Sequence, residues 1–257
     1  MEQKNHMLKY LQKGIRFDGR KLDQYRLINV EYGVSNSAEG SAIVNVGDTK
    51  IIVGVKLAVE KPFLDTADCG NLMVNAELTP MSSPDFEPGP PTETGIELAR
   101  IVDRGIRESH AIDVHKLCIK EGEKVWSVAI DVCTLNAAGN LIDAAALGAL
   151  AALKDARYPA YDLEKNAIDY GEKTDKKLPL ECQPIAVTVW KIGDYLLVDP
   201  LPQEENAADA RLTVTTIADG SVASLQKGGD CPLSVEEVDS MVGLAIEKAK
   251  ELRKALG

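Results

Sequence analysis

The chain has 257 residues, of which 45% are hydrophobic and 27% charged, and its formal net charge is −11. A chain of this length can bury a sizeable core, as one large or two smaller domains. No apolar run approaches the 18 residues that a membrane-spanning helix requires, so we expect no contact with a membrane. The acidic balance opposes nucleic-acid binding by the chain as a whole, because neutralisation of phosphates supplies most non-specific affinity. Any such contact requires a local basic patch, which we expect beside a partner subunit.

The cysteines predict neither a disulfide framework nor a metal site. They are odd in number, widely spread and without a C-x-x-C pair: Cys69, Cys118, Cys133, Cys182 and Cys231. The three histidines do not stand at spacings that would complete a zinc site with them, so we expect no metal ion and no other cofactor. The polar N-terminal stretch lacks the apolar centre of a signal peptide. Reduced, mostly buried thiols in a cytoplasmic protein are the favoured interpretation.

Hydrophobic periodicity and turn residues predict the elements of the first half of the chain. In order, they are a short helix at 8–13, strands at 42–46 and 51–57 around a turn at 47–49, a Pro-rich loop at 79–92, a helix at 94–109, strands at 114–120 and 125–135, a turn at 136–140 and an alanine-rich helix at 141–154.

The second half repeats the order of strands followed by a helix. We expect a hairpin of strands 185–190 and 195–198, strands at 212–217 and 221–226, and a last helix that begins at Ser234 with a capping box completed by Glu237. The repetition predicts an α+β fold of two similarly wired halves. We place an N-terminal arm at 1–27, a first domain at 28–158, a connecting segment at 159–181 and a second domain at 182–257.

The helix at 94–109 carries a basic stripe. Arg100, Arg104 and Arg107 stand at i, i+4 and i+7 and so share one face. The apolar residues occupy the opposite face: Leu98, Ile101, Val102 and Ile106. A stripe of guanidinium groups can follow phosphates. The alternative is a solvated face held by the pairs Asp103–Arg107 and Glu97–Arg100, and the pattern alone does not decide between them.

Acidic residues cluster ahead of a late strand. Glu204, Glu205 and Asp209 precede Arg211, which opens the alternating run at 212–216. Clustered carboxylates can bind a divalent cation, but solvated loop acids are the favoured interpretation here.

Other polar groups have weaker patterns. Arg16 and Arg20 are either basic contacts or partners of Asp18 and Asp23, and the pairing is favoured. His110 and His115 have no nucleophile motif near them and are interpreted as surface or partly buried polar groups. The glycines at 227–230 are too few for a phosphate-binding loop and indicate a turn.

Three stretches together resemble the RNase PH family, which contains phosphate-using 3′-to-5′ exoribonucleases. They are GIRFDGR at 14–20, the run from Asp65 to Pro91 with SPDFEPGPP at its end, and DPLPQEENAADARLTVTT at 199–216. The resemblance covers roughly residues 14 to 255 and is strongest to the non-catalytic RNase PH-like ring subunit of the archaeal exosome. It implies the RNase PH-like fold, in which helices pack on mixed sheets in both halves.

The resemblance also implies that two active-site elements are lost. Catalytic members carry two aspartates six residues apart in the third stretch, and these positions fall on Glu205 and Arg211. A guanidinium cannot bind a metal ion or accept a proton. Active relatives also place Gly-Gly-Ser/Thr-Arg at a helix start, which is a natural anion site. Here Gly139 is followed by Asn140, Leu141 and Ile142, and the last two side chains cannot hydrogen-bond phosphate.

The expected function follows from the resemblance and from these losses. The chain would be a non-catalytic subunit that alternates with a catalytic sister in a six-membered ring, three copies of each, beneath RNA-binding cap subunits. It would help to form the neighbour's active site and hold single-stranded RNA, chiefly through Arg100 and Arg104, with Arg107 behind them. Two alternatives remain open: an active phosphate-dependent exoribonuclease that uses Glu205 or Asp209, and an unrelated metabolic enzyme.

Overall fold

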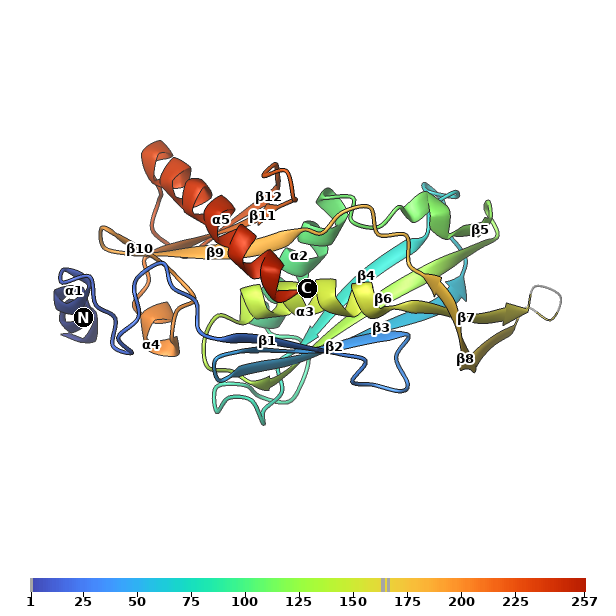
Figure 1. Cartoon of the computed structure of the whole chain (residues 1–257), viewed down its shortest axis with the longest axis horizontal. Helices are drawn as coiled ribbons and strands as arrows, with labels where there is room; N and C mark the ends of the chain where they lie inside the picture. Colours follow the sequence, from blue (N-terminus) through green and yellow to red (C-terminus); the bar gives the residue numbers. More distant parts are fainter. Residues whose placement is uncertain (1, 163–164, 166) are drawn as a thin grey trace.

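The computed structural model describes residues 2–162, 165 and 167–257. They form a six-stranded mixed sheet, a four-stranded antiparallel sheet and a two-stranded sheet, with helices packed between and around them (Figure 1). The predicted α+β class is confirmed. None of the helices in this described part is long and apolar enough to cross a membrane.

The six-stranded sheet lies in the first half of the chain. Its order is β1-β2-β3-β6-β4, with β5 also paired to β6. The strands are β1 (Ile28–Tyr32), β2 (Gly40–Val46), β3 (Thr49–Glu60), β4 (Asn71–Glu77), β5 (Cys118–Lys120) and β6 (Lys124–Asn136). All pairs are antiparallel except β4 with β6. The long strands β3 and β6 form the centre of this sheet.

The four-stranded sheet lies in the second half and has the order β10-β9-β11-β12. Its strands are β9 (Ile185–Ile192), β10 (Tyr195–Val198), β11 (Ala210–Thr216) and β12 (Val222–Gly228), and every pair is antiparallel. The predicted hairpin at 185–198 is confirmed as β9 and β10. Strand β11, which begins next to the acidic cluster, is central and pairs with both β9 and β12.

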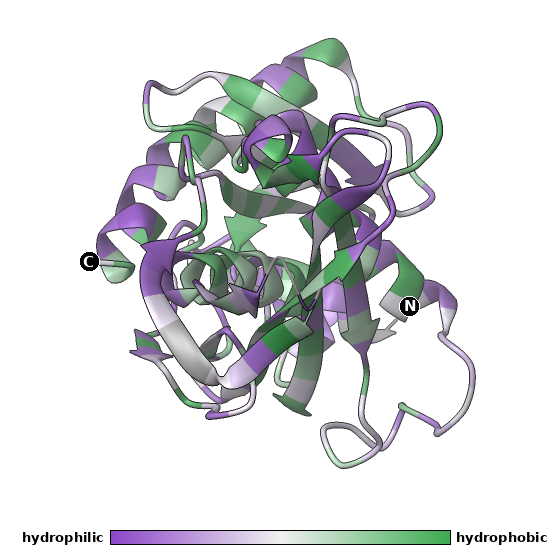
Figure 2. Cartoon of the chain, turned by 90° about the vertical axis from the view of Figure 1, so that its right-hand side faces the viewer, coloured by the Kyte–Doolittle hydropathy of each residue, from purple (hydrophilic) through white to green (hydrophobic). Residues whose placement is uncertain are grey.

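The alanine-rich helix α3 (Leu141–Asp155) joins the two halves. It packs on β2 and β3 on one side and on β9 on the other. A helix that is apolar nearly all round is suited to such a position, and Figure 2 shows hydrophobic segments gathered in the middle of the molecule. Gly148 permits the close approach, since a Cβ there would lie 2.8 Å from Val53. This contact seats α3 on the first sheet, and its packing on β9 places it next to the second sheet.

The other helices cover the outside of this arrangement. Helix α2 (Glu93–Glu108) packs on β4, α3 and β12, and α5 (Val235–Ala255) packs on β9 and β11. The predicted capping box of α5 is confirmed, with Ser234 and Glu237 bonded to each other's backbone. The leading helix α1 spans Glu2–Leu11 and so begins earlier than expected. A single turn, α4 (Pro202–Glu205), carries two of the clustered acids.

Two segments differ from the expectation. The predicted strand at 114–120 is wrong in its first half, where Val114–Leu117 forms the 3₁₀ turn η1 because the Asp113 carboxylate accepts a hydrogen bond from the His115 amide at 3.1 Å. The segment at 159–181, expected to connect the halves, contains most of a hairpin between β7 (Arg157–Asp162) and β8 (Ala167–Lys177), which projects at one end of the molecule (Figure 1). The domain boundaries themselves remain a prediction.

Candidate functional site

Helix α2 presents the predicted basic stripe, but its three arginines differ in how freely they are available. Arg100 is exposed, and it makes no side-chain hydrogen bond or ion pair with the described residues. Arg104 donates to the Gln226 side chain at 2.7 Å and to the Leu225 carbonyl at 3.2 Å, both on β12. Arg107 forms the predicted ion pair with Asp103. Arg100 is therefore the most available of the three for a ligand.

The Glu97–Arg100 pair of the alternative interpretation does not form. The Glu97 carboxylate instead forms an ion pair with Arg211 at 2.5 Å. The Arg211 guanidinium also lies over the Trp190 ring, 5.3 Å from its centroid. This arrangement joins α2 to the start of β11 and neutralises the carboxylate nearest to Arg211.

The start of α3 is occupied by a carboxylate of the chain itself. Gly139 adopts φ +88°, and a Cβ there would lie 2.3 Å from the Pro200 carbonyl, so the turn requires glycine. Asn140 follows with φ +56°, and its backbone N–H donates to the Glu205 carboxylate at 2.8 Å. Helix N-termini attract anions. In this chain Glu205 provides that anion.

The environment of Glu205 raises the pKa of its carboxyl group. Burial raises the pKa of Glu205 from 4.5 to about 6, while the Asn140 amide and the charges of Arg211 and Arg26 oppose the shift. The carboxylate is thus held in place by one amide and two nearby cations but remains costly to ionise.

Glu205 and Arg211 line one pocket, so the structure brings together the two positions that the sequence resemblance matched to the family's aspartates. The pocket has a volume of about 210 Å³. Its lining consists of Thr94, Glu97, Leu98, Leu141, Ile142, Trp190, Glu205 and Arg211. Four of these side chains are apolar or aromatic. Arg211 is neutralised by Glu97, and Leu141 and Ile142 offer no donor to a phosphate.

Beside the pocket, the buried carboxylate of Asp199 gathers polar groups from distant segments. It accepts hydrogen bonds from the Arg20 side chain at 2.7 Å, from the Arg26 side chain at 2.7 and 2.9 Å, and from the Asn140 side-chain amide at 3.0 Å. The predicted Arg20–Asp18 pair also forms, at 2.6 Å. Arg20 and Arg26 therefore hold the chain together in the region of the pocket.

The acidic cluster does not converge on a common point. Glu204 is buried and paired with Arg16, which also donates to the Val198 and Asp199 carbonyls. Asp209 forms an ion pair with Lys4. The interpretation of these acids as solvated is wrong for Glu204, because a buried guanidinium compensates its charge.

Within the described residues, the only three metal-ligating side chains that converge are Asp68, Cys69 and His115, which lie outside the pocket.

Sequence reasoning missed three parts of this region. Helical spacing made Arg100 the candidate partner of Glu97 in one of two alternatives, whereas the actual partner comes from a strand distant in sequence. Asp199 opens the third resembling stretch but was given no role, and Arg26 lies in no motif. The expected pairing of Arg16 and Asp23 with close neighbours is also wrong, since Arg16 pairs with Glu204, and Asp23 pairs with a lysine of α5 at 3.0 Å.

Comparison with known proteins identifies the family to which the chain belongs. The model of the 3′ exoribonuclease family matches in two parts, domain 1 over residues 24–159 and domain 2 over residues 182–248. The exosome complex component Rrp42 of Methanocella arvoryzae is 50% identical over 244 residues, which cover 95% of this chain and 91% of that relative. The protein of the same name from Archaeoglobus fulgidus is 45% identical over 251 residues, 98% of this chain and 94% of that relative.

Two solved structures share the fold over nearly their whole length. A chain of the Archaeoglobus fulgidus exosome with RNA bound to the active site superposes with a TM-score of 0.92 at 43% identity, covering 100% of this chain and 98% of that one. A chain of an archaeal exosome core gives 0.87 at 40% identity, covering 99% and 96%. With both family domains matched in order, the chain belongs to the 3′ exoribonuclease (RNase PH) family.

Proposed function

We propose that this chain is a non-catalytic subunit of an archaeal exosome ring and supports 3′-to-5′ phosphorolytic RNA degradation by a catalytic neighbour. The observation that carries the proposal is Arg211, paired with Glu97 inside the pocket where a catalytic relative is expected to present an aspartate. A guanidinium stays charged and has no lone pair to offer a metal ion or a proton. The pocket therefore lacks one of the two expected carboxylates.

The second support is the start of α3, which the Glu205 carboxylate of the same chain already occupies. Phosphate would have to compete with the tethered Glu205 carboxylate for the Asn140 amide. The next two side chains, Leu141 and Ile142, line the pocket without a hydrogen-bond donor. We therefore infer that this pocket lacks both a catalytic carboxylate and the side chains that would bind phosphate, and the loss of either would impair phosphorolysis.

RNA binding is the role left for the basic face of α2. Arg100 is exposed without an internal partner among the described residues, and Arg104 stands one turn further along. On a chain of net charge −11, a free guanidinium on one helix face is a local exception to the repulsion of RNA. Arg107 lies behind them and is neutralised by Asp103.

The partners belong to the same proposal. The chain would alternate with the catalytic RNase PH-like subunit in a hexameric ring, three copies of each, below RNA-binding cap subunits in the cytoplasm. The names of the relatives, exosome complex component Rrp42 and archaeal exosome core, support assembly into such a complex. The chain's contribution would be to shape the neighbour's active site across the shared interface.

The test distinguishes the activity of this chain from that of its catalytic neighbour. Purified alone, it is expected to release no nucleoside diphosphates from poly(A) with phosphate and magnesium present, and activity should appear when the catalytic subunit is added. Glu205→Gln and Asp209→Asn in the assembled ring should leave turnover intact. Robust activity of the pure chain, or collapse of turnover in these variants while RNA binding persists, would favour an active site in this chain and overturn the proposal.

A further inference from the structure

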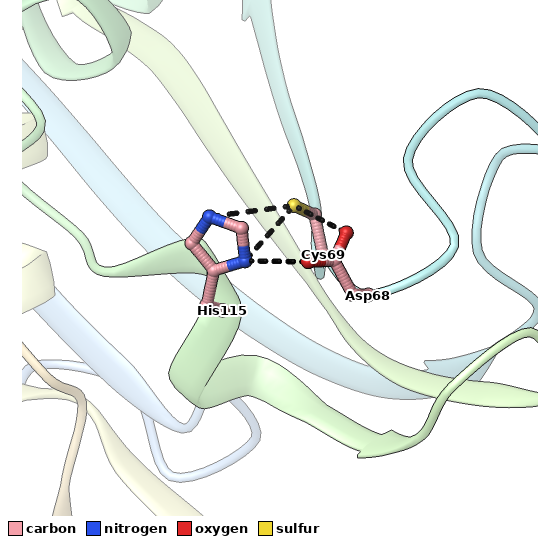
Figure 3. A group of neighbouring side chains, drawn as sticks. All are labelled: Asp68, Cys69 and His115. Carbon is pink, nitrogen blue, oxygen red and sulfur yellow. Dashed lines mark hydrogen bonds and ion pairs between the residues drawn. The ribbon is translucent and has the colours of Figure 1, made fainter.

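Three metal-ligating side chains meet at the end of the large sheet, away from the pocket. Asp68 and Cys69 lie just before β4, and His115 lies in η1 (Figure 3). The Cys69 sulfur is 3.5 Å from His115 Nδ1 and 3.5 Å from Asp68 Oδ1. His115 Nδ1 is 3.0 Å from Asp68 Oδ2. One thiol, one imidazole and one carboxylate therefore face a common point.

These separations match those between ligands around a tetrahedral zinc ion. Zinc–sulfur bonds of about 2.3 Å and zinc–nitrogen or zinc–oxygen bonds of about 2.0–2.2 Å place neighbouring ligand atoms roughly 3.4–3.6 Å apart. The observed distances of 3.0 to 3.5 Å require only small side-chain adjustments. His115 and Asp68 have 67% and 57% exposed side chains, so both can turn to make them.

The backbone beneath the cluster is fixed on both sides. The Gly70 amide donates to the Val114 carbonyl at 2.8 Å, and the Gly122 amide donates to the Ala67 carbonyl at 2.9 Å. A Cβ at Gly70 would lie 2.4 Å from Leu117, so the segment of Asp68 and Cys69 can approach η1 this closely only with glycine at that position. The two ligand-bearing segments are therefore held together before any ion binds, which reduces the entropy that binding must overcome.

The neighbouring charges also leave the carboxylate available. Lys116 is adjacent to His115, but its ammonium pairs with Asp113 at 3.2 Å and Glu181 at 2.6 Å. Within the described residues, His115 is the basic group paired with Asp68. An exposed ion pair of this kind contributes little to stability, so a metal ion can replace it at little cost.

We propose that Asp68, Cys69 and His115 bind one Zn²⁺ ion per chain, with water completing the coordination. Thiolate and imidazole ligands select zinc over magnesium or calcium, which prefer oxygen ligands alone. On binding, the Cys69 S–H bond breaks, its proton passes to solvent and a Zn–S bond forms, while His115 donates the lone pair of a neutral ring nitrogen. The ion ties the segment before β4 to η1.

Spacing rules give no sign of this site, and the sequence alone predicted none. Zinc motifs are recognised by ligands a few residues apart, whereas Cys69 and His115 are 46 residues apart. They meet because β4 and η1 adjoin at the end of the sheet. Cys231 provides a natural comparison, since its sulfur lies 3.8 Å from Asp209 Oδ1 but belongs to no such three-ligand group among the residues that the structure describes.

The test uses the reduced, metal-stripped full-length chain, titrated with Zn²⁺ by calorimetry and with Co²⁺ by absorption. We expect one tight site and the charge-transfer band of a cobalt thiolate. Cys69→Ser should abolish the band, and both Cys69→Ser and His115→Asn should weaken Zn²⁺ binding at least about 100-fold, since even changes in outer-shell partners cost up to that much. The matched controls, Cys231→Ser and His110→Asn, should bind as the unchanged chain does.

Thermal unfolding in the presence of a chelator separates binding from folding. The Cys69→Ser and His115→Asn variants should melt as the unchanged chain does without metal, and only the unchanged chain should gain stability when Zn²⁺ is added. Zinc bound equally by these variants, a cobalt band that follows Cys231, or the absence of a site tighter than the surface background would each overturn the proposal.

Discussion

The backbone amide of Asn140 donates a 2.8 Å hydrogen bond to the carboxylate of Glu205, so the first free amide of α3 is already satisfied. The positive end of a helix normally offers this group to an external anion. Glu205 comes from the short turn α4, which the buried Arg16–Glu204 pair holds in place. The start of α3 is therefore occupied by a carboxylate of the same chain, and this internal contact has measurable consequences.

The first consequence is a dependence of stability on pH. Burial raises the pKa of Glu205 from 4.5 to about 6, so between these values the folded state binds more protons than the unfolded state. Stability is then fully present below about pH 4.5 and falls as the pH rises through about 6, by roughly 2 kcal/mol. Glu205→Gln should remove this part of the fall, as measured by urea unfolding from pH 4.5 to 7.5.

The comparison must be made between variants, because another buried acid acts in the same direction. Burial raises the pKa of Asp143 from 3.8 to about 7. The difference between the unchanged chain and Glu205→Gln isolates Glu205. Replacing an exposed carboxylate, Glu60→Gln, should leave the profile as it was. Parallel profiles for the unchanged chain and Glu205→Gln would contradict the assigned shift.

The second prediction concerns the buried ion pair between Arg16 and Glu204, whose side chains are 0% and 1% exposed. Arg16→Met leaves the buried Glu204 carboxyl group without its guanidinium partner. Removing one member of such a pair costs about 3–5 kcal/mol, and the unfolding midpoint in urea should fall accordingly. The same change at the exposed Arg107 should cost about 0–1 kcal/mol. Equal effects would show that burial of the Arg16 pair is not maintained in solution.

The elements were predictable because their signals are local. The alternating runs at 42–46 and 51–57 lie within β2 and β3, and the capping box placed the start of α5 at the correct residue. The prediction of a strand at 114–120 was wrong for its first residues, because Asp113 caps a 3₁₀ turn there, although the composition of the stretch favours a strand. Short elements depend on single side-chain contacts, which periodicity does not report.

The partners of the charged residues were far less predictable. Helical spacing indicated Arg100 as the partner of Glu97, but the actual partner is Arg211, on a strand more than a hundred residues away. Arg16 and Glu204 are 188 residues apart. Such pairs are set by how the two sheets pack around α3, and no local pattern encodes them. The resemblance of the sequence predicted an arginine in place of a catalytic carboxylate, whereas the groups that neutralise Arg211 and occupy the start of α3 were not predicted.

The third prediction is that restoring one carboxylate restores metal binding without activity. Arg211→Asp would put a third carboxyl group in the pocket with Glu97 and Glu205, an arrangement that favours a divalent cation. Mn²⁺ at ten times its Kd should then raise Tm by roughly 3–5 °C. The pure variant should still release no nucleoside diphosphates, because Leu141 and Ile142 cannot bind phosphate.

Arg211→Met is the control for this experiment, since it removes the cation without adding a ligand, and Mn²⁺ should not stabilise it. Phosphorolysis by pure Arg211→Asp would show that the start of α3 still binds phosphate despite Glu205.

The last prediction ranks the arginines of α2 as RNA contacts, measured by fluorescence anisotropy on the assembled ring over a range of salt concentrations. Arg100 is free of internal bonds among the described residues, so Arg100→Gln should weaken RNA binding and lower the salt slope by about 0.7, as for one phosphate of a single strand. Arg104 must first release Gln226, so Arg104→Gln should have a smaller effect. Arg107→Gln should change neither quantity, because Asp103 already neutralises that guanidinium. A larger effect at Arg107 than at Arg100 would mean that RNA follows a different face of the helix, since these two side chains differ in their internal partners and not in charge.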